Sequence, residues 1–338
     1  MPGTKELKTR IKSIQGMRKV TKAMQMVSAA KMRKAQASVL NSRTYASLAW
    51  ELIGNLTSAS SVIASPSDSE GEAISSSNYK IASDALAMTQ NLGLLRQFPN
   101  AKKVGVIILS TNRGLVGSLN SNLIQKIRDV VQAPGLPKEQ GKALHYSAET
   151  IAELIVYGKK AKNLAARIGN KIVADFTKID RTITTEDIFP IAKFVTDVYL
   201  TGEYRKIVTV YNHFVSTVVQ KPTVKELLPF AKERVEKNNS LHPQPYTLNP
   251  QSDSDYLFEP NPTLVLEHLL PRIIESQIYQ TILESDASEH SARMIMMKNA
   301  TDAAGDLVGD LTLTYNRLRQ GKITTELAEI TAGRIALE

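Results

Sequence analysis

The feature that most constrains the fold is a helical pattern at each end of the chain. Residues 4–56 contain no proline and only two glycines, and apolar residues recur there at intervals of three and four. Such spacing is typical of a helix with a single apolar seam, close to the period of a coiled coil. A continuous helix of this length would extend about 80 Å, too long for the core of a compact domain, so we expect it to project. The predicted seam consists of Leu7, Ile11, Ile14, Met17, Val20, Met24 and Val27.

A second helical pattern begins at Thr263 and, after Pro271, continues without proline almost to the C-terminus. Its small residues, such as Ala304 and Gly305, would let another helix approach closely. We expect the two terminal helices to cover each other's seams as an antiparallel coiled coil. The predicted seam of the second helix consists of Met296, Ala300, Ala303, Leu307, Leu311, Leu318, Ile323, Leu327 and Ile330.

Between the two helices, short apolar runs alternate with helical patterns. Residues 103–110 and 151–158 are predicted strands, residues 159–169 a helix that ends on glycine, and residues 205–214 another strand. This alternation predicts a small α/β domain with a mostly parallel sheet. The predicted organisation is an N-terminal coiled-coil helix (1–56), a Ser-rich flexible insertion and connector (57–101), an α/β domain (102–230), a connecting loop (231–262) and a C-terminal coiled-coil helix (263–338).

All of the excess charge lies at the N-terminus. The 338 residues carry a formal net charge of +9, and residues 1–35 hold ten Lys and Arg against one acidic residue, Glu6. Such a segment attracts an acidic partner. Nucleic acid fits the charge, but residues 1–44 contain no aromatic residue on which a base could stack,. A membrane surface would require bulky apolar anchors. An acidic protein surface is therefore the preferred interpretation.

Residues 110–120, STNRGLVGSLN, are the one candidate for a phosphate-binding loop, because they follow a predicted strand and precede a predicted helix,. They match neither of the glycine-rich phosphate-binding patterns, so a tight strand-to-helix turn is the favoured interpretation. The five histidines lack metal-ligand spacing, and the chain has no cysteine,. From the residues alone we therefore identify no catalytic constellation, cofactor site or metal site.

Three blocks of the sequence resemble the gamma subunit of F-type ATP synthase, the central rotor shaft of that enzyme. They are IKSIQGMRKVTKAMQMVSAAKMRKAQ (11–36), LSTNRGLVGSLN (109–120) and the C-terminal stretch that includes LTLTYNRLRQGKITTELAEITAG (311–333). The resemblance covers essentially the whole chain. It implies a long antiparallel coiled coil joined to a small Rossmann-like α/β domain. It also implies a non-catalytic subunit that rotates inside a ring of three alpha and three beta subunits and couples proton flow to ATP synthesis or hydrolysis.

The resemblance also implies particular contact residues. Contacts with the beta subunit and coupling fall on Lys22 and Met24 in the first helix, and on Arg319, Gln320, Thr324 and Glu326 near the other end of the chain. Contact with the membrane rotor ring (the c-ring) and the epsilon subunit falls on Tyr256 and Glu259. The apolar tip that turns in the bearing of the ring corresponds to residues 332–337, where Arg334 departs from the family by carrying a charge.

Two other classes of function stay open at this point. A basic coiled-coil protein could bind nucleic acid through residues 1–35, which would show as salt-dependent DNA affinity. A small-molecule enzyme could use residues 110–120, which would show as saturable nucleotide binding. The absence of a cysteine pair disfavours a chloroplast form of the subunit. The resemblance then implies a peripheral protein on the cytoplasmic face of a bacterial plasma membrane.

Overall fold

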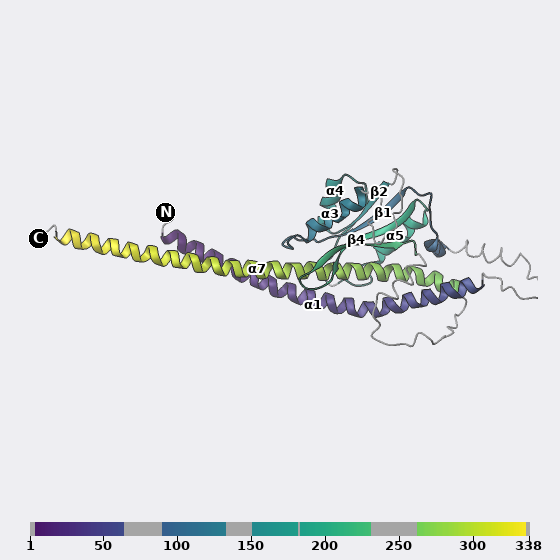
Figure 1. Cartoon of the computed structure of the whole chain (residues 1–338), viewed down its shortest axis with the longest axis horizontal. Coiled ribbons are helices and arrows are strands. Elements are labelled where there is room, and N and C mark those ends of the chain that lie inside the picture. Colours follow the sequence, from purple (N-terminus) through teal and green to yellow (C-terminus); the bar gives the residue numbers. More distant parts are fainter. Residues whose placement is uncertain (1–3, 64–89, 133–150, 182, 231–261, 336–338) are drawn as a thin grey trace, which may run out of the picture. The chain divides into compact units, whose positions relative to one another are not determined.

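The structure, a computed structural model, describes residues 4–63, 90–132, 151–181, 183–230 and 262–335 (Figure 1). The chain divides into two compact units. One, the sheet unit, comprises residues 33–114 and 118–289; the other, the helical unit, comprises residues 1–32, 115–117 and 290–338. The elements, in chain order, are α1 (Thr4–Ile63), the 3-10 helix η1 (Gln90–Leu95), β1 (Lys103–Leu109), α3 (Leu119–Gln132), β2 (Ile151–Tyr157), α4 (Lys159–Ile168), β3 (Ile172–Phe176), α5 (Phe189–Leu200), β4 (Tyr204–Phe214), β5 (Gln220–Leu228) and α7 (Pro262–Ile335).

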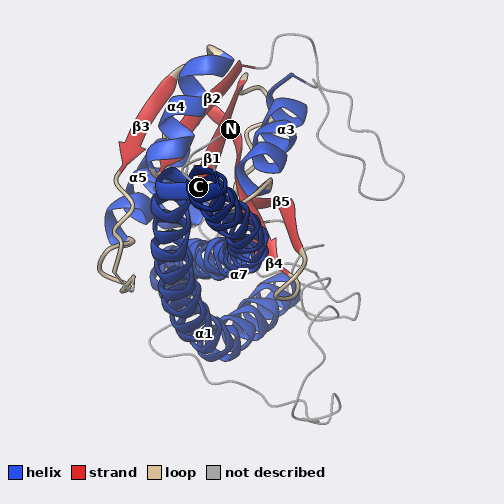
Figure 2. Cartoon of the chain, turned by 90° about the vertical axis from the view of Figure 1, so that its left-hand side faces the viewer, coloured by secondary structure: helices blue, strands red, loops and turns tan. Residues whose placement is uncertain are grey.

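The sheet unit is built on five strands in the order β3-β2-β1-β4-β5, drawn in red in Figure 2. The pairs β1–β2, β2–β3 and β1–β4 are parallel, and β5 pairs with β4 in antiparallel orientation. Parallel strands require crossover connections, and α3 and α4 supply those between β1, β2 and β3,. The prediction of an α/β domain with a mostly parallel sheet is confirmed.

Each face of the sheet carries its own apolar core. Because side chains alternate along a strand, Val106 and Ile108 of β1 face one side, where α3 and α4 pack with residues such as Leu123 and Ala161,. Neighbouring strand residues such as Ile107 face the other side, where α5 and the first part of α7 pack. The second core includes Leu266, Leu270, Ile273, Ile274, Ile278 and Ile282 of α7. The first part of α7 is therefore a layer of the α/β domain itself.

In the helical unit, α1 and α7 lie against each other in antiparallel orientation. The hydroxyl of Thr301 donates a hydrogen bond to the hydroxyl of Thr21 at 2.8 Å. Gly305 lies beside the guanidinium of Arg18, so that a Cβ on Gly305 would be 3.4 Å from its Cζ. Residue numbers thus rise on one helix as they fall on the other.

The predicted seams are correct only in part, since Met24, Leu311 and Leu318 are partly buried as expected while other predicted residues are exposed. Leu7 is buried, but Met17, Val20 and Val27 are 58%, 59% and 57% exposed. On α7, Leu307 is likewise exposed. The protected residues that follow a seam are spaced by four and three on α7, and on α1 by the same intervals apart from one gap of seven between Ile14 and Thr21, where Arg18 is exposed. They are Leu7, Ile11, Ile14, Thr21, Gln25, Ser28 and Met32 on α1, and Met297, Thr301, Ala304, Val308, Leu311, Tyr315 and Leu318 on α7.

The error has a physical cause. The prediction chose the most apolar residue of each turn, whereas the position on the helix decides which residue is covered. Small partners such as Ala304 and Gly305 let the helices approach, so Thr21 and Ser28 fit between them. The boundaries differ as well, because α1 continues to Ile63, beyond the predicted end at residue 56. Residues 64–89 lie outside the described part.

Candidate functional site

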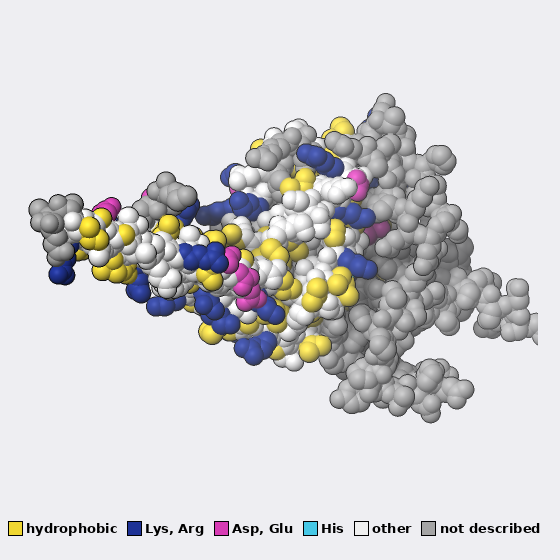
Figure 3. Space-filling model, turned by 60° about the vertical axis from the view of Figure 1, so that its left-hand side comes forward, with side chains coloured by type: hydrophobic (Ala, Val, Ile, Leu, Met, Phe, Trp, Pro, Cys, Tyr) yellow, Lys and Arg dark blue, Asp and Glu magenta, His cyan; other side chains and the backbone are white. Residues whose placement is uncertain are grey.

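The N-terminal helix presents basic and apolar side chains together on its exposed surface. Lys22 is exposed and Met24 is half-buried. The apolar residues that the seam leaves out, Met17, Val20 and Val27, lie exposed on the same helix. Figure 3 shows dark blue Lys and Arg side chains interspersed with yellow apolar ones on the surface of the helices. Within the described residues, this surface of α1 has the character of an interface, because it combines apolar contact area with charge.

The predicted contact residues near the other end of the chain lie on the exposed last turns of α7. Arg319, Gln320, Thr324 and Glu326 are all exposed. Their only described polar contacts are with α7 itself: the hydroxyl of Thr324 donates to the carbonyl of Gln320 at 2.9 Å, and Lys322 pairs with Glu326 at 3.5 Å. These bonds leave the side chains accessible to a partner.

The two predicted groups on the helices are not brought together. Thr301 contacts Thr21, next to Lys22. Arg319 lies eighteen residues beyond Thr301, which corresponds to about 27 Å along a helix. The structure therefore separates the predicted contacts into two surfaces. Tyr256 and Glu259 lie outside the described residues.

The loop after β1 occupies the place where a doubly wound sheet binds ligands. The strand order reverses at β1, since β2 and β3 lie to one side of it and β4 to the other. Ligands of such sheets bind beyond the carboxyl ends of the strands at this switch point. Here the loop of residues 110–118 lies at that end. Leu115 and Gly117 of the loop have φ of 62° and 59°, in the left-handed region that favours glycine.

The loop provides hydrogen-bond partners for the N–H groups at the start of the neighbouring helix α4. The Lys159 N–H donates to Oδ1 of Asn112 at 3.2 Å, and the Lys160 N–H to the carbonyl of Thr111 at 3.2 Å. The Ala161 N–H donates to the hydroxyl of Ser110 at 2.6 Å. A helix N-terminus attracts anions because its first N–H groups lack partners. At α4 the loop itself provides the partners, which favours the interpretation as a structural turn.

A buried ion cluster connects the loop after β3 to α7. The Lys178 ammonium lies 2.5 Å from Oδ1 of Asp286 and 2.6 Å from Oε2 of Glu289. The side chains of Lys178 and Glu289 are each 7% exposed. Burial lowers the pKa of Lys178, but the carboxylates of Asp286 and Glu289 outweigh it and raise the pKa above its ordinary value,. The ammonium is therefore charged at neutral pH.

The sequence prediction missed this cluster. Lys178 lies in a polar turn that looks like any other solvated loop. Asp286 and Glu289 gave a stronger signal, because they and Glu284 form a group of three acids within a long helical stretch that is otherwise rich in small and apolar residues. An acid in such a stretch that is buried needs a cation, but the sequence alone does not say which one.

A further polar contact joins β4 to α7. His213 lies on β4 with Nδ1 2.6 Å from Oε2 of Glu284. Among the described residues, no group of His, Asp and Glu side chains could hold a metal ion. Within the same described part, no helix combines the length and apolarity needed to cross a membrane.

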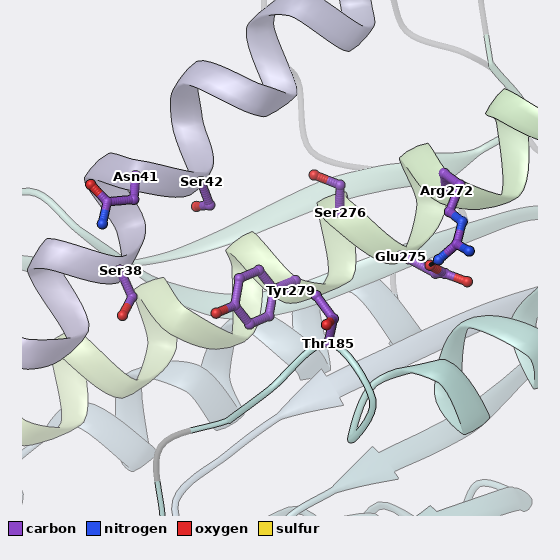
Figure 4. A pocket seen from close by; sticks show the side chains of 8 residues that line it. All are labelled: Ser38, Asn41, Ser42, Thr185, Arg272, Glu275, Ser276 and Tyr279. Atoms are coloured by element: carbon purple, nitrogen blue, oxygen red, sulfur yellow. Dashed lines mark hydrogen bonds and ion pairs between the residues drawn. The ribbon is translucent and has the colours of Figure 1, made fainter.

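A groove of about 490 Å³ lies between α1, α7 and the turn before α5. Figure 4 shows hydroxyl and amide side chains along it, with Arg272 and Glu275 paired at one end. This ion pair of 3.0 Å is largely solvent-exposed on its Arg272 side, which leaves it well screened,. Its lining residues are Ser38, Asn41, Ser42, Thr185, Arg272, Glu275, Ser276 and Tyr279.

Comparison with known proteins agrees with the fold described above. Residues 3–337 match the protein family described as ATP synthase. A protein of Roseiflexus castenholzii named ATP synthase gamma chain is 36% identical over 337 residues, which cover 100% of this chain and 99% of that protein. A protein of the same name from Legionella pneumophila is 35% identical and is covered over 100% of both chains.

A solved structure shows the same fold. It is the Euglena gracilis mitochondrial ATP synthase, in an assembly described as OSCP/F1/c-ring in rotational state 3. The similarity has a TM-score of 0.57 at 17% sequence identity, covering 99% of this chain and 94% of that one. With relatives above 30% identity along their full length, the chain belongs to the ATP synthase gamma-chain family.

Proposed function

We propose that the chain is the central-stalk rotor subunit of an F1Fo ATP synthase. In this role it couples proton flow through the membrane sector to ATP synthesis or hydrolysis by rotating inside the catalytic head. Membership of the gamma-chain family supports the role. The structural observation that carries it is the accessible apolar surface on both long helices, with Val20 and Leu327 59% and 60% exposed. An exposed apolar surface of this kind marks an interaction site, as expected for helices that turn inside a ring of partner subunits.

The two helices pair as a left-handed coiled coil in this proposal. Protected residues follow alternating spacings of four and three on α7, and on α1 the same repeat of seven residues in two turns holds apart from the exposed Arg18. Such a repeat makes two helices wind around each other to keep their seams in contact. The hydrogen bond between Thr21 and Thr301 fixes the register of the pair.

The partners are three alpha and three beta subunits, the epsilon subunit and the c-ring. The basic surface of α1 with Lys22 and Met24 faces acidic loops of beta. The exposed end of α7, from Arg319 to Glu326, meets a further loop of beta. Tyr256 and Glu259 contact the c-ring and epsilon. The complex is peripheral on the cytoplasmic face of a bacterial plasma membrane, and the chain itself is non-catalytic, as part of a larger enzyme.

Rotation couples the sites because each rotor angle presents different side chains to each beta subunit. A conformation of beta that binds the presented surface more tightly becomes more populated, so turning the rotor shifts each catalytic site in sequence. Two features make the rotor asymmetric. The exposed surface of α1 is basic, whereas α7 carries exposed Asp302, Asp306 and Asp310 on successive turns.

Co-expression with matching alpha and beta subunits tests the proposal. We expect size-exclusion chromatography to yield a complex with one copy of this chain per three alpha–beta pairs, whose ATPase activity requires the chain. A chain that elutes alone and leaves alpha–beta activity unchanged would contradict the proposal. A DNA-binding assay at several salt concentrations would then be the next measurement.

The placement of Met24 has its own test. Met24→Lys adds a charge to the surface assigned to beta, so we expect fewer protons pumped per ATP hydrolysed. Met24→Leu keeps an apolar side chain of similar size and serves as the matched control. An unchanged ratio in Met24→Lys would remove Met24 from the contact surface.

A further inference from the structure

We propose that a set of polar contacts, called here the polar clamp, holds α7 over its last turns in the sheet unit. The polar clamp transmits torque between the α/β domain and the helix, and Lys178 is its main positioning residue. The inference rests on the proposed rotor function and deepens it. It gives a role to the loop of residues 110–120, which that function leaves without one.

The first jaw of the clamp is the buried ion cluster. Lys178 reaches α7 from the loop after β3 and lies 2.5 Å from Asp286 and 2.6 Å from Glu289. The two carboxylates are three residues apart, so they stand on adjacent turns of one helix face. An ammonium held between them resists both rotation and sliding of α7, because either motion lengthens at least one of the two contacts.

The second jaw comes from β4 and reaches the same turns. The hydroxyl of Ser288 donates to the carbonyl of Asn212 at 2.8 Å, and Nδ1 of His213 lies 2.6 Å from Glu284. Residues 284–289 are therefore held by the loop after β3 and by β4 together. Beyond residue 289, α7 belongs to the helical unit. The polar contacts thus concentrate where the helix leaves the α/β domain.

The loop of residues 110–120 braces the first jaw. Nδ2 of Asn112 donates to the carbonyl of Lys178 at 2.7 Å, while Oδ1 of the same side chain accepts from the Lys159 N–H. The guanidinium of Arg113 pairs with Asp180 at 2.9 Å. The backbone that carries Lys178 is thereby attached to β1 and α4. The ligand-binding edge of the fold is used here to position a helix.

The nature of these contacts favours force transmission over simple stabilisation. Earlier along α7, contacts with the sheet are apolar, as at Ile273 and Ile278, and apolar attraction has no preferred direction,. A buried ion pair contributes little net stability compared with well-packed apolar side chains, because desolvation offsets the attraction. What it does supply is a fixed geometry. A helix that transmits torque needs a fixed geometry where it contacts the α/β domain.

The test measures the torsional stiffness of the rotor. The chain has no cysteine, so Val218→Cys in the exposed turn between β4 and β5 gives a unique labelling site. A probe attached there reports the angular fluctuations of the α/β domain. The measurement uses the complex with immobilised alpha–beta rings, with rotation stalled during turnover. The clamp variant is Lys178→Met with Asp286→Asn and Glu289→Gln, which removes the charges and keeps the side-chain volumes close.

We expect the angular variance of the clamp variant to rise about twofold, because angular thermal motion grows as stiffness falls. Lys178→Arg keeps the charge and is expected to retain most of the stiffness. The matched control is Lys171→Met with Glu153→Gln, which removes an ion pair of 3.1 Å elsewhere on the sheet. The control should leave the variance unchanged, which separates the clamp from general destabilisation.

Equal variance in the wild type and the clamp variant would overturn the inference, and so would an equal rise in the control. If the clamp variant does not fold, the Ser288→Ala variant tests the inference instead. It removes one hydrogen bond of the second jaw, so the angular variance should rise by less than the twofold expected for the clamp variant. Unchanged variance in Ser288→Ala would then overturn it. Failure of the proposed function looks different, because the wild-type chain would neither assemble nor rotate.

Discussion

The two ends of α7 have the same secondary structure in opposite surroundings. Between Leu266 and Glu289 most residues are buried in the sheet unit, whereas every residue from Arg319 to Ile335 is exposed. Both stretches nevertheless carry large apolar side chains at helical spacing, such as Ile278 and Leu327. Apolar residues in the first stretch hold the chain together. Those in the second are available to another molecule, so similar sequence patterns serve folding in one place and assembly in the other.

The largest effect is expected in the buried stretch. Ile278 is 1% exposed, so Ile278→Ala should lower the free energy of unfolding by about 2–5 kcal/mol through lost burial and the cavity left behind. Leu327→Ala is the matched control and should change it by no more than about 0.5 kcal/mol. Urea unfolding of the full chain measures both. Comparable losses of unfolding free energy at the two positions would show that the buried and exposed stretches of α7 do not differ in their contribution to stability.

The exposed stretch should respond in assembly instead. Leu327→Ser combined with Ile330→Ser removes two accessible apolar side chains, each worth about 1.5–3 kcal/mol when fully buried by a partner. We expect affinity for the alpha–beta ring to fall at least about tenfold, equivalent to roughly 1.4 kcal/mol, while the stability of the free chain stays the same. Arg317→Ser, also on an exposed part of α7, is the control. Normal affinity in the double variant would show that the ring does not cover this stripe.

A smaller effect is expected where α1 and α7 pair. Thr301→Val keeps the shape of the side chain but removes its hydrogen bond to Thr21, and should cost about 1 kcal/mol of unfolding free energy. Thr312→Val is the control, because the hydroxyl of Thr312 is exposed and bonds to its own helix at the carbonyl of Val308. Thermal unfolding compares them. Identical stability of the two variants would indicate that this contact does not hold the helices in register.

The smallest effect concerns pH and a buried carboxylate of the sheet. Burial alone would raise the pKa of Glu153, but hydrogen bonds from Tyr204 and Lys171 and the charge of Lys103 outweigh it and lower the pKa below its ordinary value of 4.5,. A lowered pKa contributes stability above about pH 4.5 that is lost as pH falls through the folded value.

Glu153→Gln should therefore be less stable than the wild type near pH 7, and the difference should shrink below about pH 4.5. Melting temperatures measured between pH 7 and pH 3 would show the convergence. Asp302→Asn, at an exposed position, should parallel the wild type throughout. A gap between Glu153→Gln and the wild type that stays constant with pH would assign the lost stability to packing instead of charge.

The sequence predicted the elements with the strongest local patterns. Residues 103–110 and 151–158 were identified as strands because β-branched and apolar residues are concentrated there, and the long helices because their apolar residues recur at threes and fours. The strand Ile172–Phe176 was not predicted. It is short and only half-buried at the edge of the sheet, where the apolar signal is weakest,.

What the sequence by itself determined is the organisation of the chain: two long terminal helices, a parallel α/β domain between them and a basic N-terminus. The tertiary structure decided which face of each helix is covered, turning Met17 and Val20 outward and Thr21 inward. It also joined Lys178 to Asp286 and Glu289, more than a hundred residues apart. Helical periodicity is a local property that a sequence displays, whereas the choice of partner depends on long-range contacts that only the folded chain brings together.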